Sequence, residues 1–235
     1  MTPDTIMIFA AGHGTRMRPL TDTIPKPLVR IDGVPMIDRA LRHADQAGIR
    51  RKVVNTHYLG SAISDHLQGR DDVLISAEPQ AALETGGGLK QALPLLGPDP
   101  VFTINPDAVW TGGNPLGVLA KTWDAGKMDA LLLLVPVRRA IGHVLGGDFT
   151  MAADQRLRRA KKHDPSAFVY TGAQILHTDL VAEIPDDTFS LNLVWDKMIG
   201  GGRLFGCVFG GDWVSVGTVD SLALAEQHLK GAADV

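Results

Sequence analysis

The residues best suited to chemistry lie near the start of the chain, where two glycines and several basic side chains follow a short apolar run. Residues 10–28 read AAGHGTRMRPLTDTIPKPL and come directly after TIMIF. Gly12 and Gly14 would let backbone N–H groups approach phosphate oxygens closely. Four basic residues face one acid, Asp22, a local surplus of three positive charges (four minus one) from Arg16, Arg18, Lys26 and Arg30. This segment is predicted to bind phosphate groups.

The opening segment matches neither common nucleotide-binding motif. Met17 stands where the third glycine of GxGxxG would be, and GxxxxGK[ST] does not occur in the chain. Without further information, a glycine-containing turn with solvated basic side chains would also explain the pattern. Pro25 and Pro27 favour the phosphate site, because they restrict the backbone on either side of Lys26.

A candidate metal ligand, Asp107, lies in FTINPDAVW, just after an apolar strand. Magnesium is commonly bound by one or two carboxylates together with substrate phosphates and water. An acid at a strand end can instead cap a turn, so the residue type alone leaves both interpretations open. The scattered histidines lack the spacing of zinc ligands. His13, inside the phosphate loop, is interpreted as a neutral hydrogen-bond donor or a bystander.

Three glycines in LETGGGLKQALPLLG, residues 83–97, precede a segment of helical period. They predict a loop on which a flat nucleobase could lie against the backbone, and composition equally allows a flexible loop before a helix.

Apolar, β-branched runs alternate with amphipathic stretches, which predicts an α/β fold with a mostly parallel sheet flanked by helices. The expected strands are 5–11, 52–57, 73–77, 101–105, 129–137, 168–176 and 203–209. The expected helices are one around 37–44 that stops at Gly48, and 58–68, 87–96, 115–126, 190–199 and 219–230, the last capped by Thr218. Residues 140–172 are predicted to form hairpin-like strands that make the second, substrate-binding wall of a cleft. One domain is expected over residues 1–235.

Composition excludes several classes of protein. The net charge of -3 gives no global basic field, so nucleic acid is not expected as a partner. No window is long and apolar enough for a membrane span, and no signal-type segment begins the chain. The single cysteine, Cys207, is expected to be a buried strand thiol in a reducing compartment, and we expect a cytoplasmic protein. A monomer or weak dimer is expected.

The string FAAGHGTRMRPLTDTIPKPL resembles the signature of the sugar-1-phosphate nucleotidyltransferases, which runs LAAGxGTRMxPLT and then PKPL. The resemblance implies a Rossmann-like sheet with a nucleotide-binding half over about 1–125 and a sugar-binding half over about 126–235. It implies transfer of a nucleotidyl group from a nucleoside triphosphate to a sugar 1-phosphate, with Mg²⁺ on Asp107. Arg16 would grip the β- and γ-phosphates and Lys26 would lie near the α-phosphate. Nucleotide contacts would come from Ala11, Gly12, Gly14 and Thr15.

The same resemblance supplies expectations for the base and the sugar. ETGGG followed by ALPLLG is similar to the N-acetylmuramate 1-phosphate uridylyltransferase branch, which implies UTP, N-acetylmuramate 1-phosphate and a role in peptidoglycan recycling. Gly86, Gly87 and Glu78 would lie near the base. The sugar side would include Gly147, Lys161, Gly172 and Asn192. Trp195 is interpreted as a buried helix residue rather than a sugar platform.

Two departures from the family pattern affect the expected metal site. Pro106 stands where glycine is usual before the aspartate. In DWVSVGT, Ser215 occupies the place of a second metal-binding aspartate, which is then missing unless Asp212 or another group replaces it. The pattern leads us to expect weaker magnesium binding, reliance on the nucleotide's own phosphates, or reduced activity.

Other functions fit parts of the sequence. Mannose 1-phosphate guanylyltransferase is the alternative within the same chemistry, because the pattern does not separate a pyrimidine from a purine. A module that binds nucleotide or sugar phosphate without turnover is the alternative of another class, supported by Ser215. A nicotinamide oxidoreductase is disfavoured by the absent third glycine and by the lack of a clear acid ending the second strand.

Overall fold

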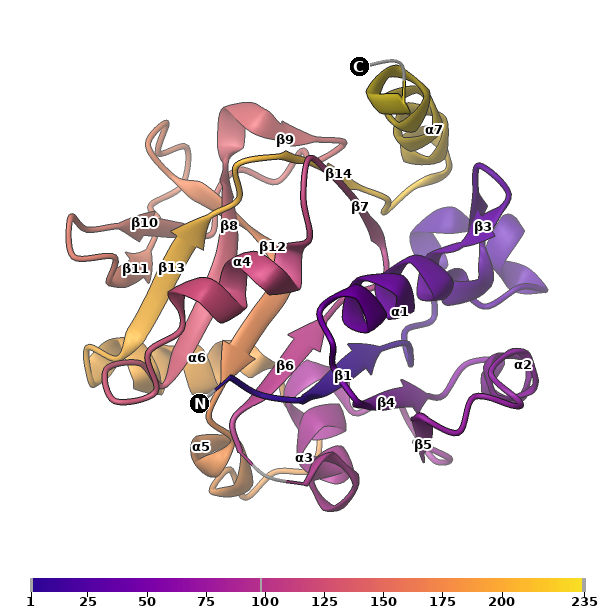
Figure 1. Cartoon of the computed structure of the whole chain (residues 1–235), viewed down its shortest axis with the longest axis horizontal. Helices are drawn as coiled ribbons and strands as arrows, with labels where there is room; N and C mark the ends of the chain where they lie inside the picture. Colours follow the sequence, from indigo (N-terminus) through magenta and orange to yellow (C-terminus); the bar gives the residue numbers. More distant parts are fainter. Residues whose placement is uncertain (1, 98, 234–235) are drawn as a thin grey trace.

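A mixed nine-stranded sheet forms the centre of the molecule (Figure 1). The computed structural model describes residues 2–97 and 99–233. In the first part of the sheet, β1 lies between β4 and β6, and β4 pairs with β5, all in parallel. These strands are β1 (Thr5–Phe9), β4 (Arg51–Thr56), β5 (Val73–Ala77) and β6 (Val101–Ile104). The expected parallel core is therefore confirmed.

The long strand β12 (Phe168–Leu176) connects this parallel core to the rest of the sheet. It runs antiparallel to β6 on one side and to β8 (Ala130–Pro136) on the other, and β13 (Leu204–Val208) pairs with β8 in parallel. One sheet thus continues across residue 125, and the division into two functional halves there stays a prediction. Cys207 lies buried on β13, as expected, and burial raises the pKa of its thiol to about 12.

The region 140–172 contains the short strands and turns that the sequence predicts. β10 (Phe149–Met151) and β11 (Leu157–Arg159) form an antiparallel hairpin beside the start of β12. β9 (Ala140–Ile141) joins β7 (Ala108–Thr111) and β14 (Asp212–Ser215) in a separate three-stranded sheet. β2 (Arg30–Ile31) and β3 (Val34–Pro35) form a small antiparallel pair.

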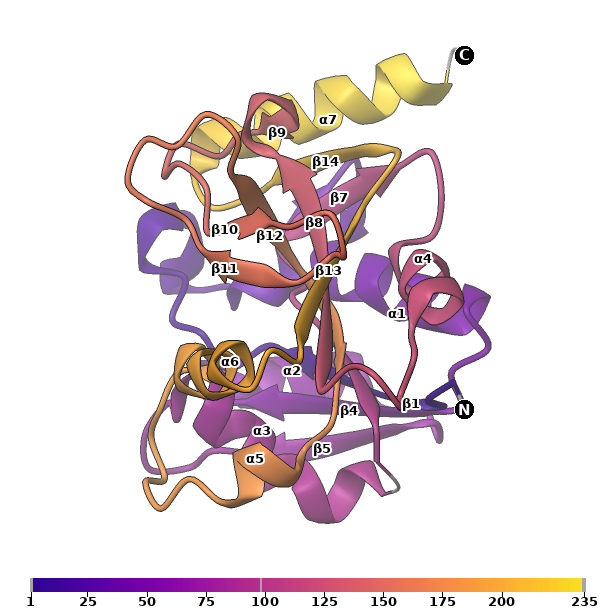
Figure 2. The same cartoon turned by 90° about the vertical axis from the view of Figure 1, so that its left-hand side faces the viewer.

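Helices cover both faces of the central sheet, as the turned view shows (Figure 2). On one face lie α1 (Met36–Gln46), α2 (Gly60–His66) and α4 (Pro115–Thr122). On the other lie α3 (Glu84–Leu96), α5 (Asp179–Ala182) and α6 (Leu191–Gly200). The last helix, α7 (Val219–Ala233), packs beside the three-stranded sheet.

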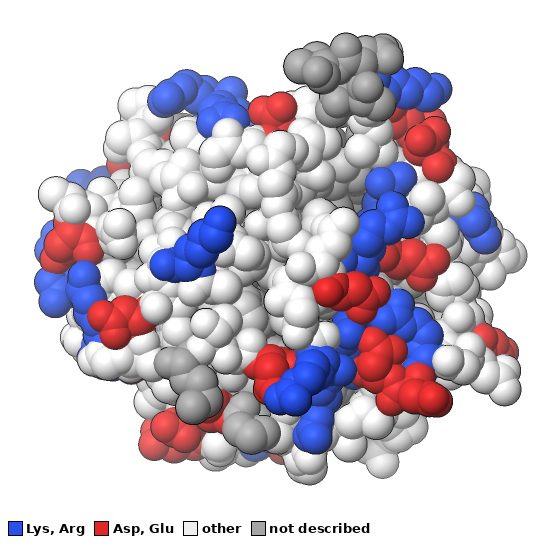
Figure 3. Space-filling model, in the orientation of Figure 1, with Lys and Arg blue, Asp and Glu red and all other residues white. Residues whose placement is uncertain are grey.

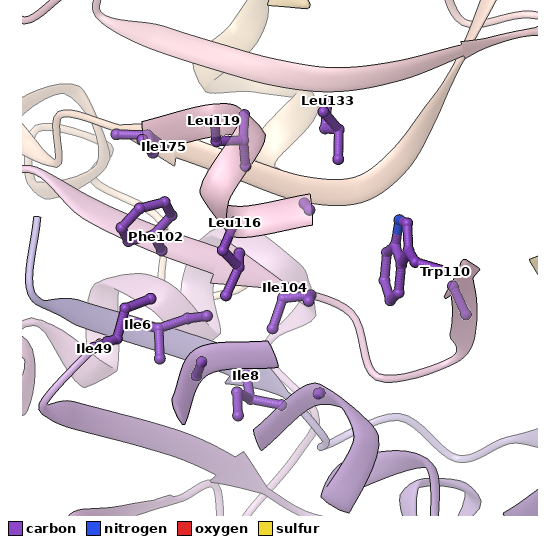
Figure 4. Packing of buried hydrophobic residues seen from close by; sticks show 14 of the residues in the cluster. Ile6, Ile8, Ile49, Phe102, Ile104, Trp110, Leu116, Leu119, Leu133 and Ile175 are labelled. Atoms are coloured by element: carbon purple, nitrogen blue, oxygen red, sulfur yellow. The ribbon is translucent and has the colours of Figure 1, made fainter. Parts of the chain in front are cut away.

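The alternation of side chains along each central strand explains why both faces need helices. On β1, Ile6 and Ile8 point into the cluster beneath α1 and α4, whereas Met7 points into the cluster beneath α3 and α6. Successive side chains of a strand point to opposite faces, so a strand buried on both sides reads as a continuous apolar run. Figure 4 shows the first cluster, in which Phe102 and Leu116 pack beside the β1 isoleucines.

A third apolar cluster lies between α7 and the opening loop. It joins Met17 of that loop, Val29, Val109 of β7, Val216 just after β14 and Ala225 of α7. The helix begins after Thr218, whose Oγ1 accepts a hydrogen bond from the Ser221 backbone N–H at 3.4 Å, so the expected cap is confirmed.

The surface carries both signs of charge. On the face shown in Figure 3, lysines and arginines are interspersed with aspartates and glutamates. Within the described ranges, no helix has the length and apolar character needed to cross a bilayer. The expected cytoplasmic location and oligomeric state stay predictions.

His43 of α1 is a titratable group held in the core. Its ring meets Trp110 edge-on, with 5.6 Å between ring centroids, and its Nδ1 is buried without a hydrogen-bond partner in the described part of the chain. The pKa of His43 is lowered from 6.5 to about 4. Burial is the main cause of this decrease, and the nearby positive charges of Arg39 and Arg42 contribute the rest.

We therefore expect the free energy of unfolding to decrease as the pH falls from 6.5 to about 4. The unfolded chain protonates His43 at the higher pH and the folded chain only at the lower, so the unfolded state binds more protons in this window. The contribution is at most about 3 kcal/mol. Urea titrations at about pH 7.5 and about pH 4.5 should show that the free energy of unfolding decreases less for His43→Gln than for the wild type. The exposed-site control His163→Asn should lose as much as the wild type, and equal losses in all three proteins would contradict the assignment.

Candidate active site

A cavity of about 220 Å³ opens where β1, β4, β5 and β6 end at their carboxyl ends. Ligands of open α/β sheets bind at this edge, because the loops that follow parallel strands meet there. Five of the residues predicted from the sequence line the cavity: Ala11, Gly12, Lys26, Glu78 and Asp107. The fold thus brings together side chains that are far apart in the sequence.

The two glycines of the opening loop, Gly12 and Gly14, are needed for different structural reasons. Gly14 has a φ of +64°, and a Cβ there would lie 3.0 Å from Lys26 Cβ and 3.1 Å from Thr21 Cγ2. Thr21 also donates a hydrogen bond to the Gly14 carbonyl at 2.8 Å. Gly12 has no atom within 4 Å of the place where its Cβ would be, and it lines the cavity. Gly12 therefore leaves room for a ligand, whereas Gly14 lets Lys26 pack over the loop.

Lys26 and Asp107 form an ion pair in the wall of the cavity. The Lys26 Nζ lies 2.5 Å from Asp107 Oδ2, and the two side chains are 14% and 32% exposed. Pro25 and Pro27 on either side of the lysine are buried. The ammonium is consequently held in one place, as the paired prolines predict.

Asp107 lies in the turn between β6 and β7, and neighbouring strands hold its backbone. Its carbonyl accepts a hydrogen bond from the Val216 N–H at 2.8 Å, and the Asn105 N–H donates to the Gly172 carbonyl at 2.9 Å. Gly172 has a φ of +89° at an irregularity in β12, and a Cβ there would lie 2.9 Å from Asn105 Cβ. The Gly172 position therefore supports the turn that carries Asp107.

Arg16 lies outside the cavity lining, on a single 3₁₀ turn (Thr15–Met17). Its side chain is exposed, and its guanidinium faces Gly217, just after β14. Thr15, on the same turn, is also exposed and outside the lining. His13 is exposed as well, with its ring 5.3 Å from that of His57 and 5.5 Å from that of Tyr58.

A buried polar network connects the opening loop to the opposite wall of the cavity, and sequence reasoning missed its central residue, Asn55. The Asn55 Oδ1 accepts from the Ala10 N–H at 2.7 Å, and its Nδ2 donates to Glu78 Oε1 at 2.7 Å. The other carboxylate oxygen of Glu78 accepts from the Leu83 N–H at 2.8 Å. Glu78 is 2% exposed, so its carboxylate positions the backbone from inside the protein. A polar residue within an apolar strand was the available signal.

The expected glycine loop before α3 is wrong. The helix begins at Glu84, so Gly86 and Gly87 lie in its first turn and are buried. Both N–H groups donate to the Phe189 carbonyl, at 2.8 and 3.0 Å. A Cβ on Gly86 would lie 2.3 Å from the Phe189 ring, and one on Gly87 would lie 2.0 Å from the Asp187 carbonyl oxygen.

Close packing of α3 against residues 187–189 thus explains these glycines, and neither lines the cavity. Glu84 and Thr85 are the residues of this helix that do. A role for Gly86 or Gly87 in base binding stays a prediction.

The predicted sugar-side residues do not line the cavity. Gly147 packs against Ala167, since a Cβ there would lie 2.3 Å from Ala167 Cβ. Lys161 is exposed, and Asn192 Nδ2 donates to Ser190 Oγ at 3.0 Å near the start of α6. Trp195 is buried and its Nε1 donates to Gln174 Oε1 at 3.0 Å, which confirms the structural interpretation of this tryptophan.

The Asp212 carboxylate contacts other side chains and does not lie beside Asp107. Its carboxylate pairs with Arg139 at 3.3 Å and with His228 at 3.4 Å. It stands three residues before Ser215 on β14, roughly 10 Å along the strand. Ser215 pairs with Ala108, next to Asp107. The suggestion that Asp212 supplies the second carboxylate is therefore not supported. Among the described residues, no three His, Cys, Asp or Glu side chains lie close enough together to form a metal site from the protein alone.

Comparison with known proteins identifies relatives over the whole length. A model of the family described as nucleotidyl transferase matches residues 5–231. The chain is 37% identical to the N-acetylmuramate alpha-1-phosphate uridylyltransferase of Caulobacter vibrioides over 98% of both chains. It is 34% identical to the protein of the same description from Neisseria meningitidis serogroup B, over 96% of this chain and 98% of that protein. The crystal structure of HddC from Yersinia pseudotuberculosis matches with a TM-score of 0.78 and 22% identity, over 97% of this chain and all of that one.

The Glu78 network yields a test that separates support of the loop from reading of the base. In Glu78→Gln, one of the two donors, Asn55 Nδ2–H or Leu83 N–H, faces an amide N–H₂ and loses its acceptor. We expect a loss of about 1–3 kcal/mol in stability. We also expect weaker binding of UTP and GTP by a similar factor, measured by isothermal titration calorimetry. The matched change Glu84→Gln, on the same wall, should leave stability close to wild type. An effect of Glu78→Gln confined to one base would contradict the supporting role.

Proposed function

The chain belongs to the nucleotidyl transferase family, and from this premise we propose that it transfers a uridylyl group from UTP to N-acetylmuramate 1-phosphate. The products are a UDP-sugar and pyrophosphate. The observation that carries this choice of substrates is the full-length similarity to two N-acetylmuramate alpha-1-phosphate uridylyltransferases. Such a reaction would serve the reuse of peptidoglycan sugars in the cytoplasm.

The chemistry requires positioning of anions rather than a general base. An oxygen of the sugar phosphate, already ionised at neutral pH, attacks the α-phosphorus of the nucleotide. A new O–P bond forms while the bond between the α-phosphorus and the bridging oxygen breaks, and the electron pair leaves with pyrophosphate. The protein must neutralise charge on oxygens that would otherwise repel one another.

Lys26, Gly12 and Arg16 are suited to this neutralisation. Lys26 is fixed in the cavity wall by Asp107, and its ammonium would meet the α-phosphate. Gly12 leaves open space through which phosphate oxygens can reach backbone N–H groups. Arg16, exposed outside the cavity lining, would meet the leaving β- and γ-phosphates. Ala11, Gly14 and Thr15 shape this loop.

The residues around Asp107 fit a magnesium ion that is carried largely by the nucleotide. The Asp107 carboxylate is one-third exposed, and its Oδ1 accepts no hydrogen bond from the described residues. Magnesium characteristically uses one or two carboxylates plus substrate phosphates, so Asp107 would hold it alone on the protein side. When bound, the ion would supply positive charge to the phosphate oxygens. Ser215 in place of a second carboxylate is expected to weaken that binding.

The base and sugar would occupy opposite ends of the cavity. We place the base beside α3, near Glu84 and Thr85, with Glu78 as the residue that holds this wall. The sugar would extend toward β12 and the strands of 140–172. The position of Gly172 on β12 favours this placement of the sugar, because Gly172 packs against Asn105 and Asn105 lines the cavity. Gly147, Lys161 and Asn192 remain proposed contacts on the sugar side.

A binding module without turnover is the second candidate, and Ser215 is the observation that favours it. Mannose 1-phosphate guanylyltransferase remains the alternative substrate pair within the family. The intact Lys26–Asp107 pair favours an active enzyme over the binding module.

Release of pyrophosphate in the presence of magnesium tests the proposal. Four nucleoside triphosphates, UTP, GTP, dTTP and CTP, would be combined with the 1-phosphates of N-acetylmuramate, N-acetylglucosamine, glucose and mannose. We expect the highest kcat/KM for UTP with N-acetylmuramate 1-phosphate. Preference for GTP with mannose 1-phosphate would favour the guanylyltransferase. Absence of release with every pair, in protein that binds nucleotide, would favour the binding module.

Lys26→Ala shows whether the measured turnover comes from this site. We expect kcat to fall by roughly two to three powers of ten, comparable to the loss of one oxyanion donor. Arg18→Ala is the matched control, because Arg18 is exposed and pairs with Asp22 at 3.2 Å outside the cavity lining. Near wild-type turnover in Lys26→Ala would remove the lysine from the mechanism.

A further inference from the structure

The guanidinium of Arg16 lies flat against a residue that no expectation singled out, Gly217. A Cβ built on Gly217 would be 3.2 Å from Arg16 Nη1, 3.3 Å from Nη2 and 3.4 Å from Cζ. Three nearly equal distances mean that the plane of the guanidinium faces the bare backbone of the glycine. The Arg16 side chain forms no hydrogen bond or ion pair among the residues that the structure describes, and its guanidinium atoms are the nearest that a side chain at position 217 would meet.

The backbone of Gly217 is held on both sides. The preceding residue, Val216, donates its N–H to the Asp107 carbonyl at 2.8 Å and is buried in the cluster that includes Met17, the neighbour of Arg16. The following residue, Thr218, caps the start of α7 and shares hydrogen bonds with Ser221, whose Oγ accepts from the Thr218 N–H at 2.9 Å. Gly217 is thus a fixed point between the Asp107 turn and the last helix.

We infer that Gly217 is a positioning residue, whose buried backbone sets where Arg16 meets the departing pyrophosphate. The inference rests on the proposed function for the identity of the anion. An arginine side chain has many rotamers, and each one excluded before the ligand arrives reduces the entropy lost on binding. The flat contact with Gly217 restricts the guanidinium without using any of its N–H donors. All of them remain available to phosphate oxygens.

A side chain at position 217 would disturb Arg16 rather than the fold. Gly217 does not have a positive φ, so other residues can adopt its backbone conformation. The atoms nearest to an added Cβ belong to the Arg16 guanidinium, so this group would be displaced by a few tenths of an ångström while the backbone keeps its place. Alanine therefore moves the guanidinium slightly, and valine moves it further.

The test measures binding of inorganic pyrophosphate by calorimetry, which does not depend on turnover. We expect Gly217→Ala to raise the Kd about threefold and Gly217→Val to raise it about tenfold, the size of a weakened charge-assisted hydrogen bond. The control is Gly210→Ala, where an added Cβ has no atom within 4 Å and the φ is also not positive. That variant should bind like the wild type. All variants should keep a melting temperature close to that of the wild type.

An Arg16→Ala background distinguishes positioning from a general structural effect. If Gly217 acts through Arg16, adding Gly217→Ala to Arg16→Ala should cause no further loss of pyrophosphate affinity. Further loss in that background, or unchanged affinity in Gly217→Ala and Gly217→Val, would overturn the inference. If the wild-type protein releases pyrophosphate from UTP but shows no measurable binding of pyrophosphate, the inference about Gly217 is overturned and the proposed function is not. Protein that does neither would overturn the proposed function as well.

Discussion

The ion pair of Lys26 and Asp107 is the interaction on which the geometry of the cavity depends. Its partners are 81 residues apart in the sequence and are joined at 2.5 Å in the folded chain. An ammonium and a carboxylate in a wall of low exposure each lower the cost of placing the other there. The opening loop and the β6–β7 turn must therefore be held in a fixed relation, and much of the surrounding structure serves to hold them.

Two sets of contacts maintain that relation. On one side, the Asn55 amide joins the Ala10 backbone to the Glu78 carboxylate, which in turn holds Leu83 and the start of α3. On the opposite side, the cluster around Val216, Met17 and Ala225 packs α7 between the opening loop and β14. The cavity is thus framed by buried contacts, whereas Gly12 in its lining and Arg16 outside the lining are exposed and free to meet a ligand. A preformed site of this kind loses less entropy when anions bind.

Much of this arrangement could be predicted from local sequence signals. Short apolar, β-branched runs identified the central strands, and helical spacing over 37–44 identified α1, whose buried face includes Ile37, Ala40, Leu41 and Ala44. Gly14, Lys26 and Asp107 were identified by residue type and position. Gly86 and Gly87 were misassigned to a loop, because consecutive glycines usually signal one, whereas here the close approach of Phe189 and Asp187 requires them inside a helix. These tertiary contacts join residues at least 100 positions apart in the sequence, which no local pattern reveals. Asn55, Gly217 and the engagement of Asp212 by Arg139 depend on tertiary contacts in the same way.

The most direct test of the central role of Asp107 and Lys26 is the affinity for UTP with magnesium and with chelator, compared between the wild type and Asp107→Asn. In the wild type, magnesium should lower the Kd strongly, because the ion would connect the phosphates to the carboxylate. In Asp107→Asn, magnesium-free UTP should bind at least as well as to the wild type, since a repelling charge is gone and Lys26 is released. The effect of magnesium should then shrink by about tenfold, corresponding to one lost charged contact. An unchanged magnesium effect in Asp107→Asn would contradict the account.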